Sequence, residues 1–236
     1  MKSIQRNARL AGVLYLVITV FAVVAHMYIP STLIVPGDAA ATVENITQSE
    51  MLFRVGSVGS ELIILLSELV LAILLYVLLK PVNKTLSLIA AVSRLIMTTI
   101  HGFNLINYFF ILTLVSGAGF LSGFGAGQIN SLVMLFLEAH SYGFTIGIAF
   151  LTIHVLLLGY LIIKSGYFPK ILGILFLIAG LGYVIDSFSL LLLPGYTTTP
   201  IYIAIPIAIS EIAFPLWLLI KGVNKEKWQE WNKQTA

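Results

Sequence analysis

The chain has 236 residues, of which 59% are apolar and 10% are charged, and its mean hydropathy is +1.02. Soluble domains carry about 25% charged and about 45–50% apolar residues, so this composition excludes an ordinary soluble fold and indicates one helical bundle in a membrane. The net charge is only +3, no run is basic enough for nucleic-acid binding, and the absence of cysteine excludes disulfides and cysteine-based zinc sites.

Six apolar segments are each long enough to cross the roughly 30 Å hydrocarbon layer of a bilayer. Their apolar residues run continuously instead of alternating with polar ones, which favours helices over a membrane barrel. The first segment is too long for the core of a signal sequence, so we interpret it as a retained helix. The segments are 9–30, 51–79, 85–116, 130–163, 169–193 and 200–221. The predicted fold class is an all-α, polytopic membrane helical bundle of six transmembrane helices.

Lysine and arginine alternate with the predicted crossings. They occur at the N-terminus, in the turns that begin at Lys80 and Lys164, and in the tail, whereas the links 31–50, 117–128 and 194–200 have none. Because basic loops remain on the cytoplasmic side, the pattern predicts a multi-pass protein of the cell (cytoplasmic) membrane with both termini in the cytoplasm.

The chain is expected to form one domain. Residues 1–223 are predicted to be a single six-helix transmembrane domain, followed by a short cytoplasmic or interfacial tail at 224–236. The tail carries Trp228 and Trp231 among charged residues. This composition suits either a segment at the level of the lipid headgroups or a frayed end.

Ionisable residues are frequent within the predicted helices, although each costs at least about 2.5–3.5 kcal/mol at mid-bilayer. In the second helix, Arg54, Glu61 and Glu68 are spaced by seven residues, which keeps them on one face. In the third helix, Arg94 and His101 belong to a series of polar residues at three- and four-residue steps. Such stripes are expected to face the interior of the bundle.

The rise of an α-helix gives the depth of each residue below its nearest basic loop. Counted in this way, Glu68 lies roughly 18 Å deep, and Arg94, His154 and Glu211 each lie roughly 15 Å deep. Arg94 can neutralise Glu68 or Glu211, because a buried guanidinium needs a carboxylate. This middle layer is either a set of structural ion pairs that determine helix packing, or a site that holds a substrate headgroup or relays protons.

A second layer is predicted further from the basic loops. Glu61 lies roughly 28 Å, His101 roughly 26 Å and Asp186 roughly 24 Å along their helices. Histidine and carboxylate are ligands for zinc and other divalent metals, and they also suit proton transfer near neutral pH. No motif such as HExxH is present, so the metal interpretation depends on convergence at one depth, with a hydrogen-bonded polar core as the alternative.

The candidate site is therefore a set of residues on five helices. The candidate binding residues are Glu61, Glu68, Arg94, His101, His154, Asp186 and Glu211, with Glu61, His101 and Asp186 as candidate metal ligands. Three other ionisable residues, His26, Glu138 and His140, are expected to be interfacial and wet. Pro206 and Pro215 can kink the sixth helix on either side of Glu211.

Several stretches of the chain carry a family resemblance. They are LGYLIIKSGYFPKILGILFLIAGLGYVID at 158–186, SEIAFPLWLLIKGVN at 210–224, the opening RNARLAGVLYL, and EAHSYGF. From about residue 7 to 224 the chain resembles a bacterial multi-pass membrane family catalogued as domain of unknown function 4386. The resemblance implies a protein of the cytoplasmic membrane, and it implies no activity, cofactor or catalytic residue.

Three kinds of function are compatible with these features. The first is a protein that binds or transports a small molecule or ion at the buried polar site; six helices are few for a carrier, so a homodimer in the lipid bilayer is then expected. The second is an intramembrane hydrolase acting on lipid, in which Glu61, His101 and Asp186 hold a divalent metal such as zinc or act as acid and base. The third is a structural or sensory subunit of a membrane complex, in which the buried charges only specify helix packing.

Overall fold

The computed structural model describes residues 2–234, and all regular structure in that range is helical. Six of the described helical stretches are long and apolar enough to cross a membrane. They are Ser3–Leu33, Glu50–Leu79, Lys84–Val115, Ala126–Ser165, Lys170–Leu192 and Ile201–Ile220. Each stretch overlaps one of the six predicted segments, which confirms the fold class as an all-α, multi-pass bundle.

Several of these stretches consist of more than one helical element. The first contains α1 (Lys2–Val23), the π-helical segment η1 (Val24–Tyr28) and α2 (Ile29–Leu33). The second contains α4 (Glu50–Phe53), the π-helical segment η2 (Arg54–Gly59) and α5 (Ser60–Leu79). The third contains α6 (Lys84–Asn104) and α7 (Ile106–Val115), and the remaining three are α8 (Ala126–Ser165), α9 (Lys170–Leu192) and α10 (Ile201–Ile220). Outside them are α3 (Ala39–Gln48), the 3₁₀ turn η3 (Gly119–Leu121) and α11 (Lys225–Gln234).

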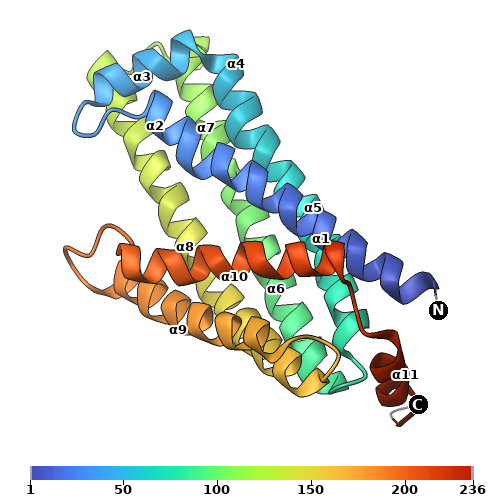
Figure 1. Ribbon diagram of the computed structural model, residues 1–236. Helices are drawn as coiled ribbons and strands as arrows, with labels where there is room; N and C mark the ends of the chain where they lie inside the picture. The colour runs from blue at the N-terminus through green and yellow to red at the C-terminus, as the bar shows by residue number, and fades with distance from the viewer. Residues whose placement is uncertain (1, 235–236) are drawn as a thin grey trace.

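The six long helices pack as a closed ring. Helix α1 contacts α5 and α10, α6 contacts α5 and α8, and α9 contacts α8 and α10. Small residues permit the closest crossings: a Cβ atom on Gly12 would lie 2.8 Å from the carbonyl oxygen of Pro215, and one on Gly159 would lie 2.8 Å from that of Gly173. Figure 1 shows α2, α3 and α4 gathered at one end, and α11 with both termini at the other.

The side chains are distributed as expected for a bundle surrounded by lipid. The outward faces of α5, α9 and α10 expose large apolar residues such as Leu66, Ile178 and Ile209. The interior of α5 buries polar residues instead, among them Ser60, Glu61 and Glu68. Large apolar side chains on the outside, with ionisable side chains enclosed, are unfavourable in water and favourable in a bilayer.

The apolar interior is divided into two clusters along the bundle. The larger cluster joins α1, α5, α8, α9 and α10, and the smaller cluster joins α2, α4, α7 and α8 near α3. Along α5 and the segment before it, Val58 belongs to the smaller cluster and Ile64 to the larger one. Polar residues that lie between these clusters are therefore removed from both ends of the bundle.

The four basic segments meet at one end of the bundle, which we call the basic end (residues 2–9, 80–84, 164–170 and 221–233). Gln5 donates a hydrogen bond to the carbonyl oxygen of Lys221 at 2.8 Å and accepts one from the backbone of Val223. The hydroxyl of Tyr167 and the indole of Trp228 both donate to the carbonyl oxygen of Leu78, at 2.8 and 3.0 Å. The tail is thus a helix docked on the bundle.

Candidate functional site

Four polar side chains from four helices meet in a group that we call the arginine cluster: Tyr15, Glu68, Arg94 and His154. Arg94 pairs with Glu68 through two nitrogens, with Nε facing one carboxylate oxygen and Nη2 lying 2.9 Å from the other. Its Nη1 lies 3.1 Å from the hydroxyl of Tyr15 and 3.0 Å from Nε2 of His154. Arg94 therefore pairs with Glu68, one of the two acids predicted from depth.

The hydrogen bonds of this cluster determine the tautomer of His154. Its Nδ1 lies 2.9 Å from the carbonyl oxygen of Ala90, which can only accept a hydrogen bond, and its Nε2 faces Arg94, which can only donate one. His154 must therefore be a neutral imidazole with the proton on Nδ1. The ring acts as an acceptor for Arg94, and the only charged groups of the cluster are Arg94 and Glu68.

Glu211, the other acid of the predicted middle layer, has a different partner. One of its carboxylate oxygens accepts a hydrogen bond from the hydroxyl of Tyr183 at 3.1 Å. This contact connects α9 with α10, while the arginine cluster connects α1, α5, α6 and α8. Each of the six long helices thus contributes a polar side chain to the interior. Because Arg94 is closely paired, the arginine cluster can hold its four helices together.

A second polar group lies at the boundary between the two apolar clusters, and we call it the histidine layer: His26, Glu61, His101 and His140. In α6, His101 follows Met97 of the larger cluster and precedes Leu105 of the smaller one. Two of these residues lie in or next to π-helical segments. His26 lies within η1, and Glu61 is the second residue after the end of η2. Segments η1 and η2 contact each other, and π-helical turns occur frequently at functional sites.

One carboxylate oxygen of Glu61 has no hydrogen-bond partner. Within residues 2–234, this atom, Oε1, is the only buried side-chain nitrogen or oxygen that forms no hydrogen bond. This oxygen lies 3.4 Å from Nε2 of His26. The side chain of Glu61 is 3% exposed, whereas that of His26 is 27% exposed. The acid is therefore enclosed, and the histidine lies between it and the surface.

The other two members of the layer, His101 of α6 and His140 of α8, lie where these two helices contact each other. Nε2 of His101 lies 3.0 Å from the carbonyl oxygen of Phe144, and the amide of Asn104 donates to the carbonyl oxygen of His140 at 2.8 Å. The ring of Phe144 lies between two histidines, with centroid distances of 4.5 Å to His26 and 4.8 Å to His101. Because a carbonyl oxygen only accepts, Nε2 of His101 carries a proton.

Two expectations about the ends of the helices need correction or refinement. His140 is buried and stacks on Tyr108 with a centroid distance of 3.9 Å, so the prediction that it is wet at the interface was wrong. The reason is that α8 continues inside the bundle well beyond this residue. Arg54 is exposed and pairs with Glu50 at 2.7 Å, so it does not share the buried environment of Glu61 and Glu68.

Asp186 is separate from both polar groups. Its two carboxylate oxygens accept hydrogen bonds from the hydroxyls of Tyr196 at 2.7 Å and Thr199 at 2.8 Å, both in the loop that joins α9 to α10. Partial removal from water, together with the bond to Asp186, raises the pKa of Tyr196 to about 12. The structure does not bring Asp186 together with Glu61 and His101, and across residues 2–234 no group of three histidines or carboxylates is arranged to hold a metal.

Three residues of these groups, Tyr15, His26 and His140, are not among the candidate binding residues predicted from the sequence, and His140 has been described above. Tyr15 was not singled out, although it is a hydroxyl-bearing side chain within the long apolar run of the first helix. His26 was expected at the interface, although it is the one histidine, acid or basic residue between Arg9 and Asp38. An isolated polar residue in a membrane helix is a signal for a buried partner, and that signal applies to both.

The bundle of six apolar helices, which encloses a few buried polar groups, defines a multi-pass α-helical membrane protein. Residues 10–222 match the family described as "Domain of unknown function (DUF4386)", and the chain belongs to this family. An uncharacterised protein of Archaeoglobus fulgidus is 34% identical over 165 residues, which cover 70% of this chain and 82% of that protein. This relative is archaeal, so the family is not confined to bacteria. No solved structure matches the chain.

Proposed function

We propose that this membrane protein binds a proton at the Glu61–His26 pair and passes it across the bundle. The observation that carries the proposal is the enclosed Oε1 of Glu61, which has no hydrogen bond and lies 3.4 Å from Nε2 of His26. A buried carboxylate without a donor is costly unless it is protonated or faces a cation. Either state places one proton on the pair.

The surroundings of the pair favour a transferable proton over a fixed one. His26 is partly exposed, so a proton can reach its imidazole from outside the bundle, and an imidazole nitrogen can accept a proton and pass it on. On the other side of Glu61, the next polar residues on the buried face of α5 are Ser67 and Glu68. They lie about 10 Å further along the helix, at the arginine cluster, beyond one turn that buries Ile64.

The arginine cluster differs from the histidine layer because its charged groups are paired with each other, and this difference supports the proposal. Arg94 and Glu68 satisfy each other, and Tyr15 and His154 fill further positions around the guanidinium. A group that is already paired offers little to a substrate, so we assign it to holding the ring of helices in place. The incompletely paired Glu61 is the better candidate for the group that changes state.

Infrared difference spectroscopy on the purified protein tests proton binding directly. A change from acidic to alkaline buffer is expected to remove the carboxyl band of Glu61 in the wild type, and the band should be absent in E61Q. The matched control is E138Q, because Glu138 is an exposed glutamate of α8 that lies outside both polar groups. The same band in wild type and E61Q would overturn the assignment of the proton to Glu61.

Flux in liposomes tests the second half of the proposal. With a pH gradient and an interior pH-sensitive dye, the wild type and E138Q are expected to dissipate the gradient, and E61Q is expected to do so at least about tenfold more slowly. Proton binding without any flux would instead favour a sensory subunit. Equal flux in wild type and E61Q would contradict a pathway through this acid.

We further propose that the basic end faces the cytoplasm, because the four segments that carry lysine and arginine meet there. The chain has no cysteine, so single cysteines report accessibility without background. A membrane-impermeant maleimide should label S122C from outside the cell and T85C only after the membrane is opened. A six-helix transporter is also expected to form a homodimer, which light scattering of the detergent-solubilised protein would show.

A further inference from the structure

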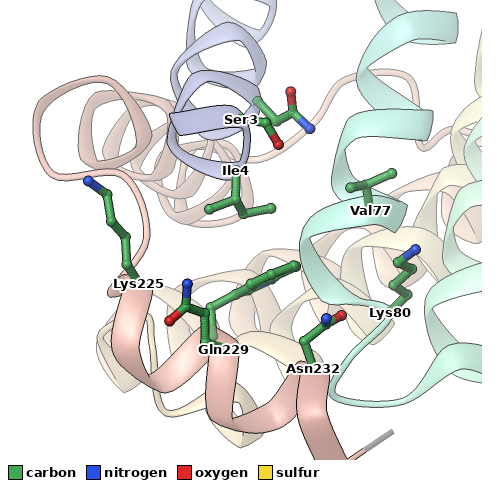
Figure 2. Close-up of a pocket in the computed structure, with 9 residues that line it drawn as sticks. Ser3, Ile4, Val77, Lys80, Lys225, Gln229 and Asn232 are labelled. Atoms are coloured by element: carbon green, nitrogen blue, oxygen red, sulfur yellow. The ribbon is translucent and has the colours of Figure 1, made fainter. Parts of the chain in front are cut away.

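A cavity of about 260 Å³ opens at the basic end of the bundle, and its lining shares no residue with the polar groups described above. Figure 2 shows it between the start of α1, the end of α5 and helix α11. Its lining consists of Ser3, Ile4, Asn7, Val77, Lys80, Lys225, Trp228, Gln229 and Asn232. Three elements that are distant in the sequence thus form one recess.

The polar lining is rich in hydrogen-bond donors and contains no carboxylate. Lys80 and Lys225 supply ammonium groups, and Asn7, Gln229 and Asn232 supply amides. The acids of α11, Glu226 and Glu230, lie outside the lining and are exposed. Within residues 2–234 the lining lysines form no ion pair and the three amides form no side-chain hydrogen bond, so their donors are free for a ligand.

The recess is preformed because α11 is fixed to the bundle. The indole of Trp228 donates to the carbonyl oxygen of Leu78 and packs beside the larger apolar cluster. The segment before α11 is held as well, because the backbone of Asn224 donates to the carbonyl oxygen of Tyr167 at 3.3 Å. Donors held on a fixed frame lose little freedom when a ligand binds.

We infer that this cavity binds a phosphate-bearing anion. Two lysines without acidic partners, surrounded by amide donors, match the charge and the acceptor oxygens of a phosphate group. The cavity is smaller than the roughly 300–1,000 Å³ typical of drug-sized ligands, which suits a phosphate and its nearest atoms. Its position at an end of the bundle is where lipid headgroups lie, so the phosphate can belong to an anionic phospholipid or to a soluble phosphate.

Native mass spectrometry of the detergent-solubilised protein tests the inference. The probes are phosphatidylglycerol, phosphatidylcholine as the zwitterionic reference, and inorganic phosphate, the last also followed by phosphorus NMR. The test variant K80Q/K225Q removes both cavity lysines. The matched control K227Q/K233Q removes the same charge from the same region, but neither residue lines the cavity.

Binding of phosphatidylglycerol in preference to phosphatidylcholine is expected in the wild type and in K227Q/K233Q, and about tenfold weaker binding is expected in K80Q/K225Q. Binding of inorganic phosphate with the same pattern would support the site and assign it to a soluble anion. Equal losses in both double variants, or no preference for either probe in the wild type, would overturn the inference.

A second variant keeps the test decisive if K80Q/K225Q folds poorly. Q229E introduces a carboxylate into the lining and leaves both lysines in place, so repulsion should weaken binding of the anion. Its matched control is Q128E, because Gln128 is an exposed glutamine at the other end of the bundle. Unchanged binding in Q229E, with the fold verified by thermal unfolding, would count against the cavity.

Discussion

The imidazole of His101 lies in the space that a side chain at position 147 would need. A Cβ atom built on Gly147 would overlap the ring at Nε2, and one on Gly143 would overlap the amide of Asn104. Glycines four residues apart on α8 thus open a groove in which side chains of α6 reach the carbonyl oxygens of Phe144 and His140. The histidine layer depends on this groove because the donors must approach the backbone closely.

Gly147→Ala is therefore expected to displace His101 and to destabilise the protein by about 1–3 kcal/mol, as overpacking of a tight contact does. Thermal unfolding in detergent measures the change. Gly127→Ala is the matched control on the same helix, since a Cβ atom there meets open space, and it should be neutral or slightly stabilising. Equal losses in the two variants would show that the groove has no special role.

Arg94 and Glu68 are expected to depend on each other for stability. Arg94→Gln or Glu68→Gln leaves a buried charge without its partner, which costs about 3–5 kcal/mol. The double variant E68Q/R94Q removes both charges and should recover part of that loss. Unfolding of the four proteins under one denaturing detergent gives the coupling energy, and additive losses would contradict a direct pair.

His154 is expected to remain a neutral imidazole with its proton on Nδ1. Nitrogen-15 spectra of histidine-labelled protein distinguish this tautomer from the Nε2–H form and from imidazolium. The variant His154→Gln assigns the signal by removing it. An Nε2–H signal would mean that the contact with Arg94 or the one with the carbonyl oxygen of Ala90 is absent in the folded protein.

Asp186 is expected to hold the loop between α9 and α10 and to have no part in proton binding. Asp186→Ala removes the acceptor for two hydroxyls, so amide exchange in residues 193–200 should rise by about tenfold or more, as about 1–3 kcal/mol of local stability is lost. Thr198→Ala, in the same loop but without a bond to Asp186, should leave the exchange unchanged. The infrared band of Glu61 should persist in both variants.

Counting along a helix predicted some contacts of the interior correctly and failed for others. Arg94 and Glu68 were expected at similar depth, and they pair because α5 and α6 are adjacent in the ring. Asp186 was expected beside Glu61 and His101, yet it binds the following loop. Counting residues gives only the depth of a side chain in the membrane. Which side chains meet also depends on the rotation of each helix about its axis and on which helix lies next to it.

The first helix also shows which features the sequence predicts and which depend on the fold. Its sequence marks Tyr15 and His26 as polar interruptions of an apolar run, but their partners, Arg94 and Glu61, lie on other helices. Neither partner could be chosen from the first helix alone. The π-helical segments η1 and η2 contain or adjoin the two residues of the Glu61–His26 pair, and the contact between these segments joins the first helix to the second.

What the sequence determined by itself is the environment and the architecture: six helices in a membrane, with acids, imidazoles and a guanidinium directed inward. The physical reason is that lipid rejects charge and unpaired backbone, and both constraints are local to each segment. Only the tertiary structure decided that Arg94 is fully engaged while Glu61 keeps a free oxygen beside His26. That difference depends on the order of helices in the ring and on distances between side chains that are remote in the sequence.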